Sequence, residues 1–378
     1  MLLHTGEVSN GYLSLICAFI QNSIERMYYM TTSSDISSRF WNLPQKPYEE
    51  TRREEIFIDD IIQKSHIERE ILSRLDGIET AFDGGGGYGR FSLLMARKGI
   101  KVTHFDISES MLKKARELAH AEGLLENITF VHGALENLED FEDGQFDMVL
   151  SFDAPISYTY PNHENVIENL IRIGSKKLII SVYSRLAWTY PFDPAQKLKY
   201  ILDKEAKDPI VRWTMEQGVP RLPAHRPDME AVWRLYETGL MERPEATAAA
   251  YEKGDTPWPV SYAFMPDELL DILGRNGAKN IKLAGPGALS RSIPHEVLVT
   301  LMREPELKRD FLDFCYHYDS QPFLSGCLQP DLLSGNGQGQ SCGGSGFIKN
   351  FIKTLSLFFP FGKRFSQGGV NTFVLLFI

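Results

Sequence analysis

The sequence predicts an α/β fold whose central sheet has seven strands, mostly parallel, with an antiparallel last strand and a helical cap insertion. Short apolar segments alternate with helical ones between residues 78 and 183, and a glycine-rich turn follows the first apolar segment. The last two apolar segments, 279–283 and 295–302, are joined by a turn with no helix between them. Such alternation is typical of βαβ units, whereas directly joined strands pair antiparallel.

The individual elements follow from hydrophobic spacing and from turn residues. A long amphipathic helix is expected over residues 51–75, because Ile58, Ile62 and Leu75 fall on or near one face. Strands are expected at 78–82, 101–105, 128–131, 146–152, 177–182, 279–283 and 295–302. Helices are expected at 90–98, directly after Ser108 as N-cap, at 163–173 and at 265–275.

The alternation stops near residue 184, where the organisation of the chain changes. Residues 184–262 are rich in proline and contain four of the five tryptophans, and the βα pattern resumes after them. We therefore expect a cap inserted at the edge of the sheet. The expected segments are 1–30, a poorly ordered extension; 31–78, a helical lead-in; 79–183, the ligand-binding core; 184–262, the cap; 263–305, the last helix and strands of the core; 306–333, a C-terminal segment; and 334–378, a tail outside the fold.

The tail differs in composition from the rest of the chain. Residues 334–346 have the glycine content of a flexible linker, and residues 347–378 contain four basic residues and no acidic one. Lys349 and Lys353 lie between apolar residues at helical spacing, as in a basic segment at a membrane surface. The abrupt change in composition favours the alternative, a tail unrelated to the fold, whose removal leaves ligand binding intact.

Composition and charge exclude several classes of protein. Lysine and arginine number 40 against 50 aspartate and glutamate residues, a formal net charge of −10, so no nucleic-acid partner is expected. Four cysteines without a C-x-x-C pair are too sparse for a disulfide framework and argue against a metal site. The cytoplasm is therefore the expected compartment. No run of about 20 apolar residues occurs, so no transmembrane span is expected.

The most informative motif is a glycine loop between the first strand and the helix after it. Residues 83–90 read DGGGGYGR, and glycines there let the backbone turn tightly and approach a ligand. Asp106, at the tip of the second strand and 17 residues after Gly89, can accept both hydroxyls of a ribose. The loop fits G-x-G-x-x-G, which is typical of nicotinamide and flavin sites, and equally D-x-G-x-G-x-G, so neighbouring motifs must decide.

Three further motifs follow the loop in order. They read HFDISESML at 104–112, FVHGALENL at 130–138 and FDMVLSFD at 146–153. The set resembles the class I S-adenosylmethionine-dependent methyltransferases over residues 79–183, and more loosely over 263–303. The resemblance implies a Rossmann-like methyltransferase sheet and S-adenosyl-L-methionine as cofactor. It implies cofactor contacts from Asp83, Gly85, Gly87, Gly89, Asp106, Ile107, Met111, Leu135, Glu136 and Phe152.

The resemblance has one departure, at the adenine end. Many members of the family have an acidic residue at the position of Ala134, where it meets the adenine amino group. Here that contact has to come from the backbone, from Glu136 or from elsewhere. Trp41 and Tyr48, ahead of the long N-terminal helix, are expected to close over the cofactor, as similar aromatic lead-ins do in relatives.

Candidates for the chemistry lie after the fourth strand and in the insertion. Asp153 and Tyr158 follow that strand, in a segment that only faintly resembles the (D/N)-P-P-(Y/F) motif of enzymes that methylate amino groups. His225, in the proline-rich part of the insertion, is a candidate general base. The aromatic residues of the insertion form either an acceptor pocket or the cap's own small core: Trp188, Tyr190, Trp213, Trp233 and Tyr236.

These observations lead to one expected function and three alternatives. We expect a methyltransferase that transfers a methyl group to a small-molecule acceptor by direct in-line displacement, holding the nucleophile in line and excluding water. The alternatives are an RNA or protein methyltransferase, a nicotinamide oxidoreductase, and a cofactor-binding methyltransferase-fold protein without activity. The acidic charge weighs against RNA. Neither the acceptor atom nor the oligomeric state follows from the sequence.

Overall fold

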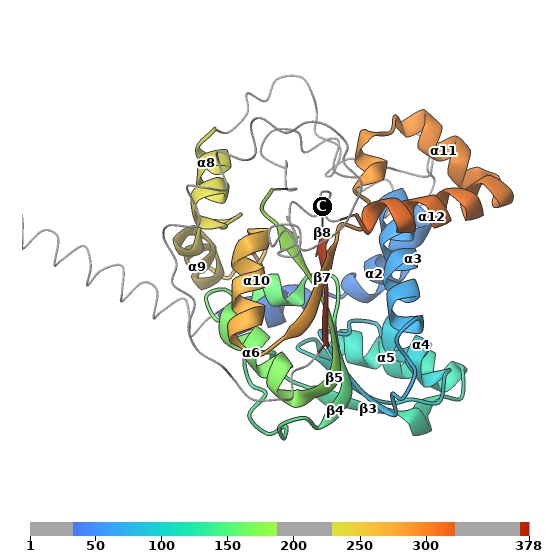
Figure 1. The fold of residues 1–378 in the computed structure, drawn as a ribbon. Helices are drawn as coiled ribbons and strands as arrows, with labels where there is room; N and C mark the ends of the chain where they lie inside the picture. Colours follow the sequence, from blue (N-terminus) through green and yellow to red (C-terminus); the bar gives the residue numbers. More distant parts are fainter. Residues whose placement is uncertain (1–32, 187–228, 322–370, 378) are drawn as a thin grey trace, which may run out of the picture.

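The computed structural model describes residues 33–186, 229–321 and 371–377. Within these ranges a single sheet is covered by helices on both faces (Figure 1). Helices α6 (His163–Ile173) and α10 (Pro266–Arg275) cover one face. Helices α3 (Ile58–Leu72), α4 (Arg90–Ala96) and α5 (Glu109–Ala121) cover the other face. The α/β fold class predicted from the sequence is therefore confirmed.

The sheet is parallel throughout its described strand pairs. Its strands are β1 (Thr80–Gly84), β2 (Lys101–Asp106), β3 (Ile128–His132), β4 (Phe146–Ser151), β5 (Gly174–Ser184), β7 (Lys279–Ala284) and β8 (Asn371–Phe377). They lie in the order β3-β2-β1-β4-β5-β8-β7, and the short β6 (Ala263–Phe264) pairs with the end of β5. Because the chain runs outward from β1 to β3 and then returns to β4 on the other side of β1, the order switches at β1 and β4. Ligands bind at the carboxyl ends of strands at such a switch point.

The remaining helices lie before, between and after these strands. They are an unlabelled helix over residues 33–41, α2 (Lys46–Ile56), α8 (Met229–Thr238), α9 (Pro244–Glu252), α11 (His295–Arg303) and α12 (Pro305–Asp319). The predicted cap, residues 184–262, thus contains α8 and α9, while residues 187–228 lie outside the described residues. The predicted extension, residues 1–30, also lies outside them. In the described part of the chain, no helix is both long and apolar enough to cross a membrane.

The core follows from the alternation of side chains along the buried strands. In β5, Leu178, Ile180 and Val182 pack into the cluster under α6 and α10, whereas Ile179 packs into the cluster under α4 and α3. Successive side chains of a strand point to opposite faces, so this near-continuous apolar run covers both. The helix after β2 begins as predicted, because the Ser108 side chain accepts a hydrogen bond from the backbone N–H of Met111.

The predicted antiparallel last strand at 295–302 is wrong, since this segment forms helix α11. Its β-branched residues favoured a strand. Pro294 lies at the N-cap of the helix, where its missing backbone N–H costs no helical hydrogen bond, so a helix can begin directly after it. Leu298 and Met302, four residues apart, pack together against Ile58 and Ile62 of α3. The helical spacing of these apolar side chains therefore decides the conformation.

The prediction that residues 334–378 lie wholly outside the fold is also wrong for part of the tail. Residues 371–377 form β8, which pairs in parallel with β5 along seven residues and with β7 on its other side. The continuous apolar run from 373 to 377 is typical of an interior strand of a parallel sheet. In Figure 1, β8 lies between β5 and the edge strand β7. Residues 322–370, with the glycine linker, lie outside the described residues.

Candidate active site

One pocket opens at the carboxyl ends of β1, β2 and β4, where the strand order switches. Its empty space is about 970 Å³, part of it open to solvent. The glycine loop forms one wall, and the helix over residues 33–41 and α2 contribute Ser37, Trp41 and Glu50 to the opposite side. Phe91, Phe152 and Tyr158 add apolar surface.

The glycine loop is shaped by contacts that leave no room for side chains. The backbone N–H groups of Gly85 and Gly86 donate to the carbonyl of Phe105 at 2.8 and 3.2 Å, which ties the loop to the end of β2. Gly85 has a φ of 71°, and a Cβ added there would lie 2.5 Å from the ring of Pro155. Only glycine therefore satisfies both the left-handed backbone and the approach of the loop after β4.

Asp83, the last residue but one of β1, presents a free acceptor to the pocket. Its side chain is fully buried, and its Oδ2 accepts a hydrogen bond of 2.6 Å from the Ser92 hydroxyl. The same hydroxyl lies 2.8 Å from Nδ1 of His104, so serine and histidine hold the carboxylate in place. Oδ1 has no hydrogen-bond partner within the described residues, although it is buried. A buried carboxylate oxygen without a donor is costly, so this atom is fitted to a donor group on a ligand.

Asp106 ends β2 beside the loop, as its predicted role requires. Its Oδ2 accepts the backbone N–H of Gly87 and its Oδ1 accepts that of Ser108, both at 2.8 Å. Burial raises the pKa of this carboxyl, while His104 and the two backbone N–H groups act in the opposite direction. A carboxylate has about four acceptor positions, so two of them stay available for hydroxyl groups.

The pocket continues from Asp106 to Ile107, Met111, Leu135 and Glu136. Glu136 is held by Ser34, whose hydroxyl donates to Oε1 at 3.2 Å, and burial raises the pKa of the Glu136 carboxyl. Ala134 is buried but does not line the pocket. Glu136 is thus the carboxylate that this wall of the pocket offers in place of the acid missing at position 134.

The segment after β4 adopts an uncommon backbone. Asp153 and Ala154 have φ values of 65° and 61°, a region that residues other than glycine seldom adopt, and Asp153 lines the pocket. Such strain is concentrated at functional sites, where the surrounding contacts hold it in place. Here the contact is an ion pair between Asp153 and Lys64, whose side chain is only 3% exposed.

Tyr158, the second predicted catalytic residue, is buried with its hydroxyl 2.5 Å from that of Tyr183. Burial and the neighbouring Tyr183 hold the pKa of Tyr158 well above its ordinary value. Its hydroxyl is therefore protonated at neutral pH, so Tyr158 is suited to pack and to hydrogen-bond rather than to act as a base. Its ring contacts Trp41 edge-on at 5.7 Å between centroids. His225 lies outside the described residues.

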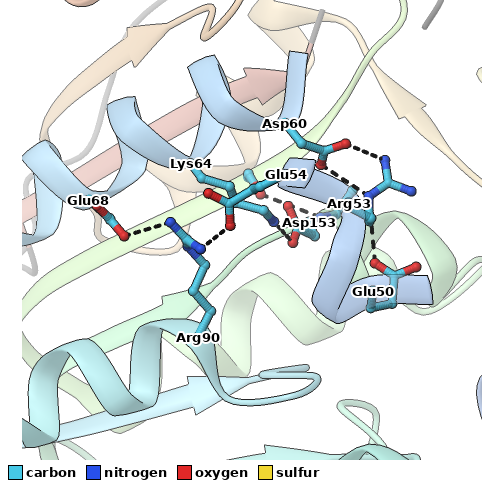
Figure 2. Close-up of polar contacts among 10 residues, drawn as sticks. Glu50, Arg53, Glu54, Asp60, Lys64, Glu68, Arg90 and Asp153 are labelled. Atoms are coloured by element: carbon cyan, nitrogen blue, oxygen red, sulfur yellow. Dashed lines mark hydrogen bonds and ion pairs between the residues drawn. The ribbon is translucent and has the colours of Figure 1, made fainter. Parts of the chain in front are cut away.

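A group of eight charged residues packs the lead-in helices onto the pocket (Figure 2). We call it the ion cluster; its members are Glu50, Arg53, Glu54, Asp60, Lys64, Glu68, Arg90 and Asp153. Arg53 binds Asp60 at 3.0 Å and reaches Glu50 at 3.7 Å. Arg90 of α4 bonds to Glu54 and, at 2.8 Å, to Glu68. The cluster thus joins α2, α3 and α4 to the segment after β4.

Burial acts in opposite directions on the pKa values of the basic and acidic members of the ion cluster. Burial alone would lower the pKa of Lys64, but Asp153 and Asp60 outweigh it and the pKa is raised. Burial raises the pKa of Glu50 even though Arg53 and Lys46 act against the shift. Lys64 is therefore a fixed cation, whereas Glu50 is a carboxyl that takes up a proton at higher pH than usual.

The structure brings most of the predicted site residues together. Nine of the ten predicted cofactor contacts line this pocket with Asp153 and Tyr158, while Gly89 lies in the loop but not on the pocket surface. Trp41 lines it as expected, but Tyr48 does not and is 49% exposed. Trp233 and Tyr236 are exposed on α8, away from the pocket lining, and Trp188, Tyr190 and Trp213 lie outside the described residues.

Sequence reasoning missed the contribution of the lead-in helices. The expected helix over 51–75 is two helices, because Phe57 is extended between α2 and α3 and redirects the chain. Glu50 and Arg53 are three residues apart on α2, and Asp60 and Lys64 are four residues apart on α3, so each pair lies on one side of its helix. That regularity was the available signal, although it also suits a solvated face. The described residues contain no cluster suited to a metal ion.

Comparison with known proteins gives matches over the core of the chain. Residues 81–176 match the family model described as a methyltransferase domain. The tRNA 5-carboxymethoxyuridine methyltransferase of Escherichia coli (strain K12) is 32% identical over 68 residues, which are 18% of this chain and 26% of the relative. The chloroplastic magnesium protoporphyrin IX methyltransferase of Arabidopsis thaliana is 32% identical over 162 residues, 43% of this chain and 48% of the relative.

The solved structures similar to this chain include a putative S-adenosyl-L-methionine-dependent methyltransferase from Methanococcus maripaludis. It is 19% identical with a TM-score of 0.32, over 37% of this chain and 64% of that one. The chain spans about a quarter of the length of the E. coli relative and about half that of the A. thaliana relative. Residues 81–176 thus match a methyltransferase domain, and the four motifs within them resemble those of the class I S-adenosylmethionine-dependent family.

Proposed function

We propose that this chain is an S-adenosylmethionine-dependent methyltransferase that methylates a small-molecule acceptor by direct in-line displacement. The observation that carries the proposal is the single pocket at the switch point, which gathers Asp83, the glycine loop, Asp106 and Glu136 in the order that the cofactor requires. Enzyme activity, cofactor binding and the acceptor class all belong to this proposal, as does a cytoplasmic location, which rests on the sparse cysteines.

The residues of the pocket fit the groups of the cofactor. The unpartnered Oδ1 of Asp83 is suited to the amino group of the methionine part. The free acceptor positions of Asp106 are suited to the ribose hydroxyls, and Glu136 to the adenine amino group. When bound, S-adenosylmethionine supplies a methyl group that its positively charged sulfur already activates for displacement.

The protein's own part in the reaction is to position the acceptor and exclude water. Phe152 and Tyr158 give the pocket apolar walls, and Trp41 lies against Tyr158 on the side of the lead-in. Asp153, fixed by Lys64, presents a half-exposed carboxylate at the end of β4. Holding a nucleophile in line at near-attack distance contributes several kcal/mol to methyl transfer, roughly 7 or more in well-oriented systems.

A small acceptor is favoured over RNA by the charge of the chain and of the pocket. The net charge is −10, and the pocket lining is acidic, whereas RNA binding depends on basic surfaces. The A. thaliana relative is named for a porphyrin and the E. coli relative for a tRNA, and each covers under half of this chain. Their acceptors are therefore not assigned to this protein.

Isothermal titration calorimetry of the full chain with S-adenosylhomocysteine tests the proposal. We expect micromolar binding that Asp106→Asn weakens by about tenfold to a hundredfold, because a carboxylate that accepts two hydroxyls is replaced by an amide with one acceptor oxygen. Asp143→Asn, at a position whose side chain is 82% exposed, is the matched control and leaves the affinity unchanged. Binding of NADH in place of S-adenosylhomocysteine contradicts the proposal and supports an oxidoreductase instead.

A further inference from the structure

The active-site pocket has an unusual balance of charge. Five carboxylates line it: Glu50, Asp83, Asp106, Glu136 and Asp153. Among the described lining residues the matching cation is Arg90, which already bonds to Glu54 and Glu68. Asp83 and Asp106 are buried, and negative charge held away from water is costly, so this pocket favours ligands that carry positive charge.

The cofactor accounts for only part of this requirement. Asp83, Asp106 and Glu136 face its amino, ribose and adenine groups in the proposed arrangement, and it carries one more positive than negative charge. Glu50 comes from α2 and Asp153 from the segment after β4, and neither has a role in that arrangement. Both carboxylates line the pocket, and both belong to the ion cluster drawn in Figure 2.

The ion cluster pairs Asp153 with Lys64 but as a whole keeps an excess of negative charge. It contains five acidic residues and three basic ones, so it has two more carboxylates than cations (Figure 2). Arg53 is bound more closely to Asp60, at 3.0 Å, than to Glu50, at 3.7 Å. Lys46, the next cation near Glu50, pairs with Glu49 at 3.0 Å and leaves the excess unchanged.

Aromatic rings line the same pocket. Trp41, Tyr88, Phe91, Phe152 and Tyr158 all contribute to its surface. The face of an aromatic ring attracts a cation, and Lys46 already uses this attraction, with its ammonium 5.5 Å from the Trp41 ring centroid and 4.5 Å from that of Phe40. Carboxylates beside aromatic walls favour an organic cation over a neutral alcohol and strongly over an anionic acid.

We propose that the methyl acceptor is an amine, which enters as an ammonium ion and binds between Glu50 and Asp153. This inference rests on the proposed methyltransferase function. The amine first gives a proton to the Glu50 carboxylate, and its nitrogen lone pair then forms the bond to the methyl carbon as the carbon–sulfur bond breaks. The bonding electrons stay on sulfur, the methylated nitrogen acquires the positive charge that sulfur loses, and Glu50 returns its proton to solvent.

The two carboxylates differ in the way their surroundings hold them. Asp153 is paired with Lys64, a buried and permanently charged lysine, so it provides a constant negative charge. Burial raises the pKa of Glu50 against the opposing charges of Arg53 and Lys46, while Asp153 and Asp60 reinforce the rise. A carboxyl whose pKa lies closer to neutrality is the better proton acceptor for an ammonium group.

Calorimetry with a cation and its neutral isostere tests the inference without requiring turnover. The full chain is first titrated with S-adenosylhomocysteine and then, in its presence, with choline or with 3,3-dimethylbutan-1-ol, in which carbon replaces the charged nitrogen. We expect choline to bind at least tenfold more tightly. In buffers of different ionisation enthalpy, choline binding should release more protons as the pH is lowered below neutrality, because the cation favours ionised Glu50.

Two variants assign the effect to Glu50. Glu50→Gln should lower the affinity for choline at least fivefold and abolish proton release. The affinity for the neutral alcohol should not change. Glu55→Gln is the matched control, because Glu55 lies on the same helix, is 62% exposed and does not line the pocket.

The outcomes separate the two proposals. Absence of S-adenosylhomocysteine binding overturns the proposed function itself. Binding of S-adenosylhomocysteine with equal affinities for choline and the alcohol overturns the amine acceptor and leaves the methyltransferase function standing. Preference for choline with unchanged proton release in Glu50→Gln overturns the role of Glu50.

Discussion

Gly85 has a left-handed backbone, and its Cα faces the ring of Pro155, where an added methyl group would lie at 2.5 Å. Gly99 also has a positive φ, 82°, but an added methyl group there would meet nothing within 4 Å. Alanine at Gly99 should therefore lose only about 1–2 kcal/mol of stability through the backbone. Gly85→Ala should lose more stability and should weaken the binding of S-adenosylhomocysteine at least tenfold, because Pro155 and the segment after β4 must move.

Urea unfolding and calorimetry on both variants check this prediction. Equal losses of stability, together with unchanged affinity in Gly85→Ala, would contradict the steric argument. The comparison is informative because alanine has the same unfavourable left-handed backbone at both positions, and only the surroundings differ.

Single residues also mark the limit of what the sequence could predict for the site. Asp83, Asp106 and Met111 were accessible because each stands at a fixed short distance from a strand end, so local spacing places it. Glu50 and Lys64 were not, because they reach the pocket through the packing of α2 and α3 onto β4, which no local spacing contains. A buried lysine on an amphipathic helix has the same pattern as an exposed one.

At the level of elements, the pairing of Lys64 with Asp153 joins α3 to the end of β4. Lys64 is 3% exposed, whereas the Asp153 side chain is 48% exposed. Removing Asp153 as a partner therefore leaves a buried cation, while removing Lys64 leaves a carboxylate that water can reach. We expect Asp153→Asn to lower stability by about 3–5 kcal/mol and Lys64→Met by less.

Asparagine tolerates the left-handed backbone at position 153, so this substitution reports on charge rather than on strain. The double variant should lose less than the sum of the single variants, because the two residues interact directly. Urea unfolding of the three variants measures the coupling. Additive losses would show that the pair does not stabilise the junction of α3 and β4.

The packing of α3 on α12 includes a histidine that has to stay neutral. His66 is buried, and burial together with Arg69 and Arg74 lowers its pKa to about 3. Glu70 lies 3.7 Å away but is held by Arg74. Because the pKa in the folded state lies below the unfolded value, stability is complete above about pH 6.5 and is lost as the pH falls toward 3.

This lowered pKa predicts a loss of about 2 kcal/mol in unfolding free energy between pH 7 and pH 5 from His66 alone. His66→Phe keeps the aromatic contact with Tyr316, at 4.9 Å between centroids, and should remove this part of the pH dependence. His120→Gln, on the exposed side of α5, is the control. Urea unfolding at both pH values measures this loss. If the unfolding free energy of His66→Phe changes with pH as much as that of the parent chain, His66 is excluded as the cause.

Elements with a single consistent pattern were predicted closely. Helix α6 begins and ends at the residues expected from sequence, 163 and 173, because its apolar positions and flanking residues agree. Residues 295–302 gave two consistent patterns, β-branched content and helical spacing, and the contact with α3 favoured the helix. Local pattern fails where the partner of an element decides its conformation.

At the scale of the whole molecule, the strand order was predictable up to β5 and not beyond it. The first five strands follow one another, with helices between them except between β3 and β4, so right-handed crossovers leave few possible arrangements. β8 comes from the far end of the chain and enters between β5 and β7, separated from β7 by more than 80 residues of sequence. Composition alone had assigned it to a separate tail.

The position of β8 leads to a testable prediction about the stability of the sheet. Val374 pairs with Ile180 of β5 and with Leu283 of β7, so it lies in the interior of the ladder. Proline at this position removes a backbone donor and does not fit an interior strand. Val374→Pro should therefore reduce hydrogen-exchange protection in residues 177–183 and 279–284 and lower the melting temperature, whereas Val374→Ala should change both much less.

The pocket lies at β1, β2 and β4, on the other side of β5 from β8. S-adenosylhomocysteine should accordingly bind to Val374→Pro with an affinity within about twofold of the parent chain, as expected when a perturbation is distant from the site. Lost affinity together with unchanged protection of β5 would mean that β8 acts on the pocket by another route. Unchanged protection with unchanged affinity would mean that residues 371–377 do not pair with β5 in solution.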